Sequence, residues 1–242
     1  MTEDAEIFDL AAGHSLIDVR GGGFDSALLV GGRPIVLNWC DCAGSVAQYL
    51  ARAGRTDCER ELRSLRHTLE GHWLGDVPIR SQILPFLELF VPGRYRLCYV
   101  ESCPDCDYVE FDASWDFATR HDSFYPYGDV LVFTQSTDAL NRDRVAHYRE
   151  VIRGGHRPIA LTATAADAWC DFVIDGHHKL RAYKVEGVRP TFVSVCRLDA
   201  PRLTPGSFDA SIGARHPMSR HYRDVKTQHD AEPGAAADRP RD

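Results

Sequence analysis

The sequence predicts an α+β fold, because short buried strands and amphipathic helices follow one another along the chain. The strands are indicated by brief runs of apolar, β-favouring residues, such as Val130–Phe133 and residues 172–174. The helices are indicated by apolar residues at helical spacing that end at glycine, as in residues 141–155. A hydrophobic content of 44% over 242 residues is enough to build the core of one larger domain or two small ones.

Overall charge and the N-terminus narrow the class of protein. The net charge of −7 and the sequence pI of about 5.9 give no global basic surface for nucleic acid. Residues 1–6 are acidic and do not resemble a signal peptide, and no apolar run approaches the roughly 20 residues that span a bilayer. We therefore expect a cytoplasmic protein with no membrane partner, whose eight cysteines are mostly reduced thiols.

The first part of the chain carries both hairpin and helix signals. Gly31-Gly32 separates two apolar runs and predicts a β-hairpin. The glycines at 21–23 match neither the dinucleotide-binding nor the P-loop spacing, which favours a flexible connection over a phosphate loop. Further on, the sequence predicts helices over residues 45–54 and 56–71, and a buried helix or helix pair, interrupted at Pro85, over residues 78–92.

A Cys-x-x-Cys pair, Cys103 and Cys106, lies between residues 95–100 and 108–111, which we interpret as a second hairpin. Such a pair is half of a zinc-ribbon or zinc-knuckle site, but the available second half at residues 40–42 is one residue short of the usual spacing. Structural zinc is therefore not favoured over incidental thiols, and a redox pair is the other alternative. The remaining cysteines are expected to be small core residues: Cys58, Cys98, Cys170 and Cys196.

The sequence divides into three parts. Residues 1–125 form an α+β region of unknown role, and the aromatic residues at 115–127 either link it to the next domain or line a pocket. Residues 126–204 form a small α+β domain. From about Pro205 the apolar periodicity fades, so residues 205–242 are expected to be a disordered tail.

The most informative stretch is the strand-to-helix turn at Asp175-Gly176. A helix N-terminus presents backbone N–H groups and the positive end of the helix dipole, and glycine lets a ligand approach the backbone closely. Basic residues are normally disfavoured at this end of a helix, and a phosphate above the turn would explain them. The alternative is an ordinary turn whose basic residues are merely solvated. These residues come directly after the glycine: His177, His178, Lys179 and Arg181.

Residues 173–182 resemble the signature of the ParB/sulfiredoxin-like superfamily, a Gly-x-x-Arg-x-x-Ala box at a strand-to-helix turn. Here the box reads Gly176, Lys179 and Ala182, with lysine in place of arginine. The flanks are also similar to the family: residues 141–159 resemble its helix and Gly-x-x-Pro-Ile strand entry, and residues 187–195 its closing strand. The resemblance covers residues 129–199 and implies the superfamily fold with nucleotide binding at the glycine turn.

The branches of this superfamily differ in the residues that come after the glycine. Sulfiredoxins need a cysteine where this chain has His177. Partitioning proteins carry a Glu-Arg-Arg-like box and a basic helix-turn-helix module, neither of which is found in this sequence. Kinases that phosphorylate free serine carry Asp-Gly-His-His-Arg, to which residues 175–179 are most similar. That branch also places a glutamate before the helix at 141–153, where this chain offers Asp138 as a substitute.

The resemblance thus implies phosphoryl transfer from ATP or another nucleotide, with Mg²⁺, to a small hydroxyl compound. Lys179 and Arg181 would hold phosphates with the backbone of Gly176 and His177. Asp175 would orient the turn or bind Mg²⁺, and His178 or Asp138 would accept the hydroxyl proton. Each role has an alternative: Asp175 can stabilise the turn, the adjacent histidines point too far apart for an ordinary metal pair, and Arg181 can pair with Glu186.

Two other functions stay open from the sequence. The protein can be a non-catalytic module that senses a nucleotide, or only keeps the fold, while residues 1–125 bind a protein partner. It can also be a DNA-binding, partitioning-like or nuclease-like protein, which the acidic balance disfavours. Nucleotide binding without turnover would favour the module, and salt-sensitive retention on DNA would favour the third function.

Overall fold

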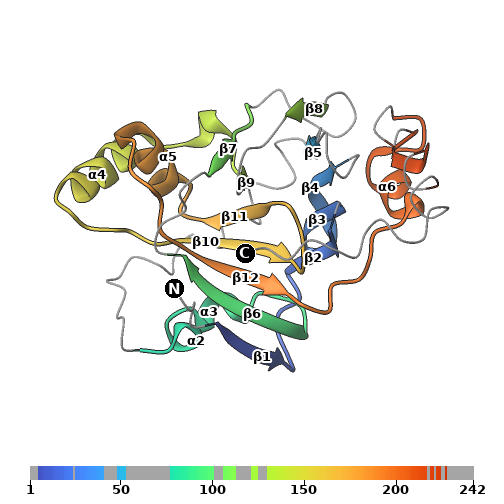
Figure 1. The fold of residues 1–242 in the computed structure, drawn as a ribbon, viewed down its shortest axis with the longest axis horizontal. Helices are drawn as coiled ribbons and strands as arrows, with labels where there is room; N and C mark the ends of the chain where they lie inside the picture. The colour runs from blue at the N-terminus through green and yellow to red at the C-terminus, as the bar shows by residue number, and fades with distance from the viewer. Residues whose placement is uncertain are drawn as a thin grey trace.

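The computed structural model describes residues 5–23, 25–40, 48–52, 77–100, 106–112, 121–124, 130–216, 219–220, 222–224 and 227. These residues form two sheets with helices around them, which confirms the α+β class (Figure 1). No helix in these ranges is both long enough and apolar enough to cross a membrane.

The larger sheet has seven strands in the order β1-β6-β12-β10-β11-β9-β7. β10 and β12 run parallel to each other, as do β7, β9 and β11, and the two groups meet at the antiparallel β10–β11 pair. β6 and β1 extend the sheet antiparallel on the β12 side. The strands are β1 (Glu6–Leu10), β6 (Gly93–Val100), β7 (Asp107–Val109), β9 (Val130–Phe133), β10 (Ala160–Ala165), β11 (Asp171–Asp175) and β12 (Phe192–Arg197).

The smaller sheet is antiparallel throughout, in the order β2-β3-β4-β5-β8. Gly31 and Gly32 connect β3 to β4 with φ of 58° and 76°, the positive values that a tight two-residue hairpin needs, so the predicted hairpin is confirmed. The helix predicted over residues 45–54 is wrong, because pairing with β4 draws residues 48–52 into a strand. The strands are β2 (Ile17–Gly22), β3 (Asp25–Val30), β4 (Arg33–Cys40), β5 (Gln48–Arg52) and β8 (His121–Phe124).

Three of the helices follow their local signals closely. The pair predicted around Pro85 is confirmed, with the proline in the first turn of the second helix. The helix predicted from Asn141 is also confirmed: Asn141 caps it and Gly154 ends it. The helix predicted over residues 56–71 lies outside the described residues. The helices are α2 (Ile79–Gln82), α3 (Leu84–Leu87), the 3-10 helix η1 (Thr137–Ala139), α4 (Arg142–Arg153), α5 (His177–Glu186) and α6 (Pro205–Ile212).

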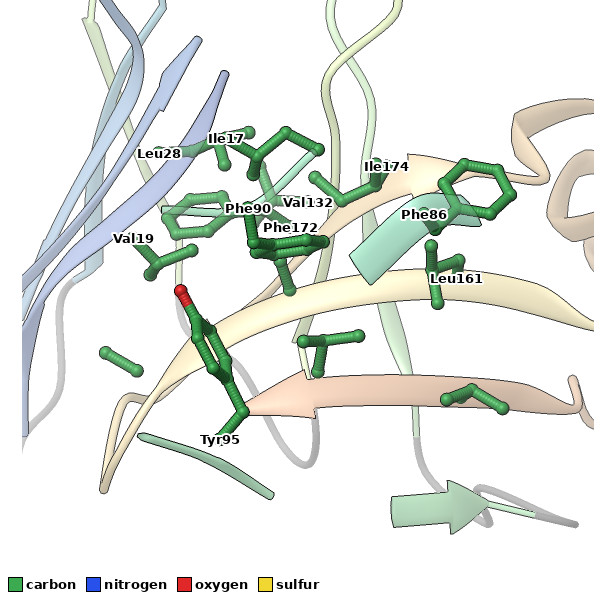
Figure 2. Packing of buried hydrophobic residues seen from close by; sticks show 14 of the residues in the cluster. Ile17, Val19, Leu28, Phe86, Phe90, Tyr95, Val132, Leu161, Phe172 and Ile174 are labelled. Carbon is green, nitrogen blue, oxygen red and sulfur yellow. The ribbon is translucent and has the colours of Figure 1, made fainter. Parts of the chain in front are cut away.

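Three apolar clusters stack these elements in layers. The largest lies between the two sheets, where Ile17 and Leu28 of the small sheet meet Phe172 of the large sheet (Figure 2). Alternate residues on the other face of the large sheet, such as Phe133 and Val173, pack beneath α4 and α5. A third cluster lies on the outer face of the small sheet beside α6 (Figure 1). The order of layers is therefore α4–α5, large sheet, small sheet, α6.

The large sheet crosses the domain boundary predicted between residues 125 and 126. β1, β6 and β7 come from the first predicted part, and β9 to β12 come from the second. The hairpin predicted from residues 95–100 and 108–111 is wrong, because β6 pairs with β1 and β12 while β7 pairs with β9. These pairings join residues that are distant in the sequence, and local patterns do not encode them.

The glycines at 21–23 end β2 in a packed hairpin, which differs from the flexible connection expected. The Gly21 N–H donates to the carbonyl of Pro201 at 2.8 Å, and Arg202 Nη1 donates to the carbonyl of Gly22 at 3.0 Å. In the aromatic stretch at 115–127, residues 121–124 form β8, and the rest of that stretch lies outside the described residues.

The described residues of the C-terminal part, 205–216, 219–220, 222–224 and 227, also differ from the disordered tail expected over residues 205–242, and the rest of that stretch lies outside the described residues. Thr204 and Ser207 form a capping box at the start of α6. Phe208 stacks on Tyr222 with ring centroids 3.9 Å apart, and Tyr222 meets the edge of Trp39 on β4. The Tyr222 hydroxyl also donates to a carboxylate oxygen of β3, at 2.7 Å. Aromatic packing therefore holds α6 and Tyr222 on the small sheet, although the sequence there lacks a long periodic pattern.

Candidate functional site

Gly176 forms the turn between β11 and α5 in a conformation that favours glycine. Its φ is 94°, in the left-handed region. A Cβ placed there would lie 2.7 Å from Ala160 Cβ and 2.8 Å from Ala160 Cα, closer than real Cβ contacts come. The glycine of the box is therefore required by the close packing of the turn on β10, whether or not a ligand binds there.

His177, the first residue of α5, is buried and turned toward the chain that comes after β9. Its Nε2 atom accepts the backbone N–H groups of Thr134 at 3.3 Å and Gln135 at 3.2 Å. Two N–H donors directed at one ring nitrogen require a lone pair there, so the proton of the neutral ring sits on Nδ1. The ring also packs against Phe133 in a T-shaped arrangement, with the two ring centroids 5.5 Å apart. This histidine therefore positions the backbone of Thr134 and Gln135 through its Nε2 atom.

His178, the next residue, makes the same kind of contact with the other end of that chain segment. Its Nε2 atom accepts the backbone N–H of Asn141, the cap of α4, at 3.0 Å. A nitrogen that already accepts a hydrogen bond is poorly placed to take a substrate proton. The structure therefore shows that His178 positions the backbone of Asn141, and the general-base role that the resemblance implied stays a prediction.

The two histidines together hold residues 134–141, which we call the 134–141 segment, against the first turn of α5. Asp138, within η1, is exposed on this segment. The Gln135 side chain donates from Nε2 to the Ala139 carbonyl at 3.0 Å and tightens the segment further. The Ser136 hydroxyl is fully buried, and no hydrogen-bond partner for it is found in the described part of the chain.

Lys179 points into the fold. Its side chain is only 4% exposed, and Nζ donates to the Ile159 carbonyl at 2.8 Å. Asp175 Oδ2 lies 3.5 Å from the same nitrogen, which also lies 5.8 Å from the centre of the Tyr148 ring. Lys179 thus contributes positive charge near the turn, while its contacts with Ile159 and Asp175 stabilise the ends of the neighbouring strands.

Arg181 is held by an acidic partner from another part of the large sheet. Its Nη1 lies 3.0 Å from both carboxylate oxygens of Glu110, to which Lys184 also donates at 2.7 Å. The pairing of Arg181 with Glu186 that the sequence allowed is not formed. Glu186 instead accepts from Arg149 and Arg153 and ties α5 to α4.

The cysteines do not assemble a metal centre in the described residues. Cys106 is disulfide-bonded. Cys103, the other cysteine of the Cys-x-x-Cys motif, lies outside the described residues. Among the residues that are described, no three His, Cys, Asp or Glu side chains are placed to hold a metal ion. Cys170 and Cys196 are buried and not disulfide-bonded, and burial raises the pKa of Cys196 to about 11, which keeps it protonated at neutral pH.

The structure brings the predicted Asp138 and the glycine turn into one region, through contacts that the sequence did not predict. Asp138 lies on the segment that these contacts fix to the turn. Thr134, Gln135 and Ser136 were not expected to take part. A polar run directly after the buried strand β9 was the available signal, because side chains at a strand end often face a site.

Chemically, this arrangement offers a helix N-terminus, a buried hydroxyl and one exposed carboxylate. Of the two predicted bases, Asp138 is exposed and His178 is half-buried. Lys179 and Arg181 each form an ion pair with a carboxylate. Their positive charge therefore acts on the site through its electric field, and not by direct contact. Comparison with known proteins found no matching family model, curated protein or solved structure.

Proposed function

We propose that the protein binds a nucleotide through its phosphate groups, at the first turn of α5 and the 134–141 segment. The observation that carries this proposal is the pair of contacts from His177 and His178. They fix both ends of the 134–141 segment at a glycine turn that opens a helix. A fixed loop beside a helix N-terminus is the setting in which proteins commonly hold phosphate.

The charges and donors nearby suit an anion. The dipole of α5 favours negative charge at its first turn. Lys179 lies in that turn, and its ammonium adds to the positive potential although it is hydrogen-bonded inside the fold. The Ser136 hydroxyl, buried and without a partner among the described residues, would gain one from a phosphate oxygen.

Phosphoryl transfer to a small hydroxyl compound is the second candidate, with ATP and Mg²⁺ as the first donor to test. The observation that favours it is the exposed Asp138 carboxylate on the same segment. A carboxylate within reach of a substrate hydroxyl can accept its proton. The resemblance to kinases of free serine points to the same reaction, in a cytoplasmic setting.

A ligand panel tests the binding proposal. Thermal unfolding and calorimetry are run with ATP, ADP, CTP and GTP, each with Mg²⁺. A ligand that binds only the native state stabilises it by mass action, by about 2.7 kcal/mol at a hundred times its Kd. At least one nucleotide is expected to raise the melting temperature. If none does so in a well-folded sample, the proposal is wrong.

Ser136→Ala, with Ser219→Ala as its control, tests whether the nucleotide binds at the 134–141 segment. Both hydroxyls are buried and neither has a partner among the described residues, so neither change should cost much stability. The nucleotide-dependent shift is expected to shrink in Ser136→Ala and to persist in Ser219→Ala. Equal shifts in both variants would move the ligand away from the 134–141 segment. Lys179→Ala is a poorer test, because Lys179 supports the fold.

A further inference from the structure

We infer that His177 is a pH-dependent positioning residue, whose protonation releases the 134–141 segment and so weakens phosphate binding. The inference takes its ligand, a nucleotide phosphate, from the proposed function. Its first step, the release of the segment when His177 is protonated, rests on the structure alone. It concerns one proton taken up from solvent at Nε2, with no covalent bond broken.

The neutral ring is the form that fits the observed contacts. Nε2 accepts from the backbone N–H groups of Thr134 and Gln135, which are fixed donors. The Thr134 hydroxyl donates to the Val173 carbonyl at 2.6 Å, so its own proton is used within the strand pair. One lone pair of the imidazole thus holds the start of the segment.

Protonation would reverse the polarity of that contact. An Nε2–H cannot accept, so the N–H groups of Thr134 and Gln135 would both lose their acceptor. The new N–H has an acceptor ready in the Thr134 hydroxyl oxygen, 3.0 Å from Nε2. The ring can therefore stay in place while the backbone it holds moves, and this gives the segment two discrete arrangements.

The charged groups around the ring are mostly engaged with one another. On α5 and β11, Lys179 pairs with Asp175; beside β7, Glu110 pairs with Arg181. The ring of His178 accepts from Asn141, and Asp138 on the segment is exposed to solvent. Apart from Asp138, these charges are paired, and the protonation state of His177 decides whether the backbone N–H groups at the start of the segment keep their acceptor.

Two measurements on the full chain test the inference. Ring ¹⁵N spectra and the amide signals of Thr134 and Gln135 are recorded from about pH 8 to pH 5, the range in which histidine switches charge. The ring of His177 should start as the Nδ1–H form, and both amides should shift as it protonates. In parallel, the affinity for ADP with Mg²⁺ should fall about tenfold or more between the same limits.

His177→Gln is the informative variant, because its amide oxygen can reach the same N–H groups and does not titrate. Its affinity, whatever its absolute value, should be the same at both ends of the range. His147→Gln changes an exposed histidine of α4 and should behave as wild type. Affinity that is independent of pH in the wild type, or that falls equally in His177→Gln, overturns the inference and leaves the proposed function intact.

If ATP, ADP, CTP and GTP all fail to bind at every pH, the proposed function is wrong. The ring and amide titration then still decides the first step of the inference. Amides of Thr134 and Gln135 that do not respond to protonation of His177 would overturn it without any ligand.

Discussion

The Nε2 atom of His178 accepts the backbone N–H of Asn141 at 3.0 Å, and so joins the first turn of α5 to the cap of α4. The Asn141 side chain in turn accepts the N–H groups of Asp143 at 2.9 Å and Arg144 at 3.1 Å. The imidazole thus fixes the backbone of the residue whose side chain starts the next helix. One side chain therefore couples the starts of the two helices.

His178→Ala is expected to lower the free energy of unfolding by about 1 kcal/mol, because the Asn141 N–H loses its acceptor in a partly exposed setting. His178→Gln should recover part of this loss, since an amide oxygen can accept the same bond. Urea denaturation measures both. His147→Ala, on the exposed side of α4, serves as the control and should cost little. A loss in His178→Ala no larger than in this control would contradict the coupling.

Gly176→Ala should be among the costly single changes in this chain. It forces alanine to a φ of 94° and brings its Cβ to 2.7 Å from Ala160 Cβ. The left-handed backbone costs about 1–2 kcal/mol and the overlap about as much again, so we expect a loss of about 3 kcal/mol.

Gly187→Ala is the matched control for that measurement. Gly187 ends α5 with a φ of 63°, and a Cβ there would meet no atom of the described chain within 4 Å. It should cost about 1 kcal/mol, the backbone part alone. Equal losses in chemical denaturation would show that the packing of the turn on β10 contributes nothing.

Glu186 should make the α4–α5 pair sensitive to acid. Hydrogen bonds from Arg153 and then Arg149 lower the pKa of its carboxyl below the usual value. A lowered folded-state pKa means that the stabilisation is present above the unfolded pKa of about 4.3 and is lost as pH falls through the folded value. Denaturation at a series of pH values should show the wild type losing more stability than Glu186→Gln between about pH 5 and pH 3.

Glu150→Gln is the control for that acid series, because Glu150 is exposed and accepts from one of the same arginines, Arg153, at 2.7 Å. It should follow the wild-type curve closely. If Glu186→Gln loses as much stability on acidification as wild type and Glu150→Gln do, the acid response arises elsewhere.

Tyr222→Phe tests the packing of the C-terminal part on the small sheet. The Tyr222 hydroxyl donates to the buried carboxylate of Asp25 at 2.7 Å, whereas that of Tyr183 donates to the Pro158 carbonyl at 3.1 Å. Hydrogen bonds to charged groups contribute more, so Tyr222→Phe should cost about 2 kcal/mol and Tyr183→Phe about 1 kcal/mol. A Tyr222→Phe protein as stable as wild type would show that this hydrogen bond contributes nothing to holding the C-terminal part on the small sheet.

The features predicted well from the sequence are those that neighbouring residues decide. Asn141 and Gly154 mark the ends of α4, Gly176 marks the turn before α5, and the Gly31-Gly32 hairpin forms as expected. Each of these signals acts within a few residues, through a cap or a left-handed backbone conformation.

The features that were missed depend on partners distant in the chain. Arg181 meets Glu110 and Lys179 meets the Ile159 carbonyl only because β7, β10 and α5 come together in the fold. The same cause explains β5 and the wrong hairpin, where pairing between distant strands overrode local propensity. The residues of the candidate site could be found from the sequence, but not the direction in which their side chains point.

Asp138→Asn separates phosphoryl transfer from binding alone. Asp138 is exposed, so the change should leave both the fold and a nucleotide-dependent thermal shift nearly unaltered. If Asp138 accepts the proton of an acceptor hydroxyl, turnover with ATP and free serine or a related hydroxyl compound should fall about 10²–10⁴-fold.

Asp143→Asn is the control for this test. Asp143 is an exposed carboxylate in the first turn of α4, and the variant should retain that activity. Equal turnover in wild type, Asp138→Asn and Asp143→Asn would remove Asp138 from the chemistry. Nucleotide binding without turnover in any of the three would leave the protein as a binding module.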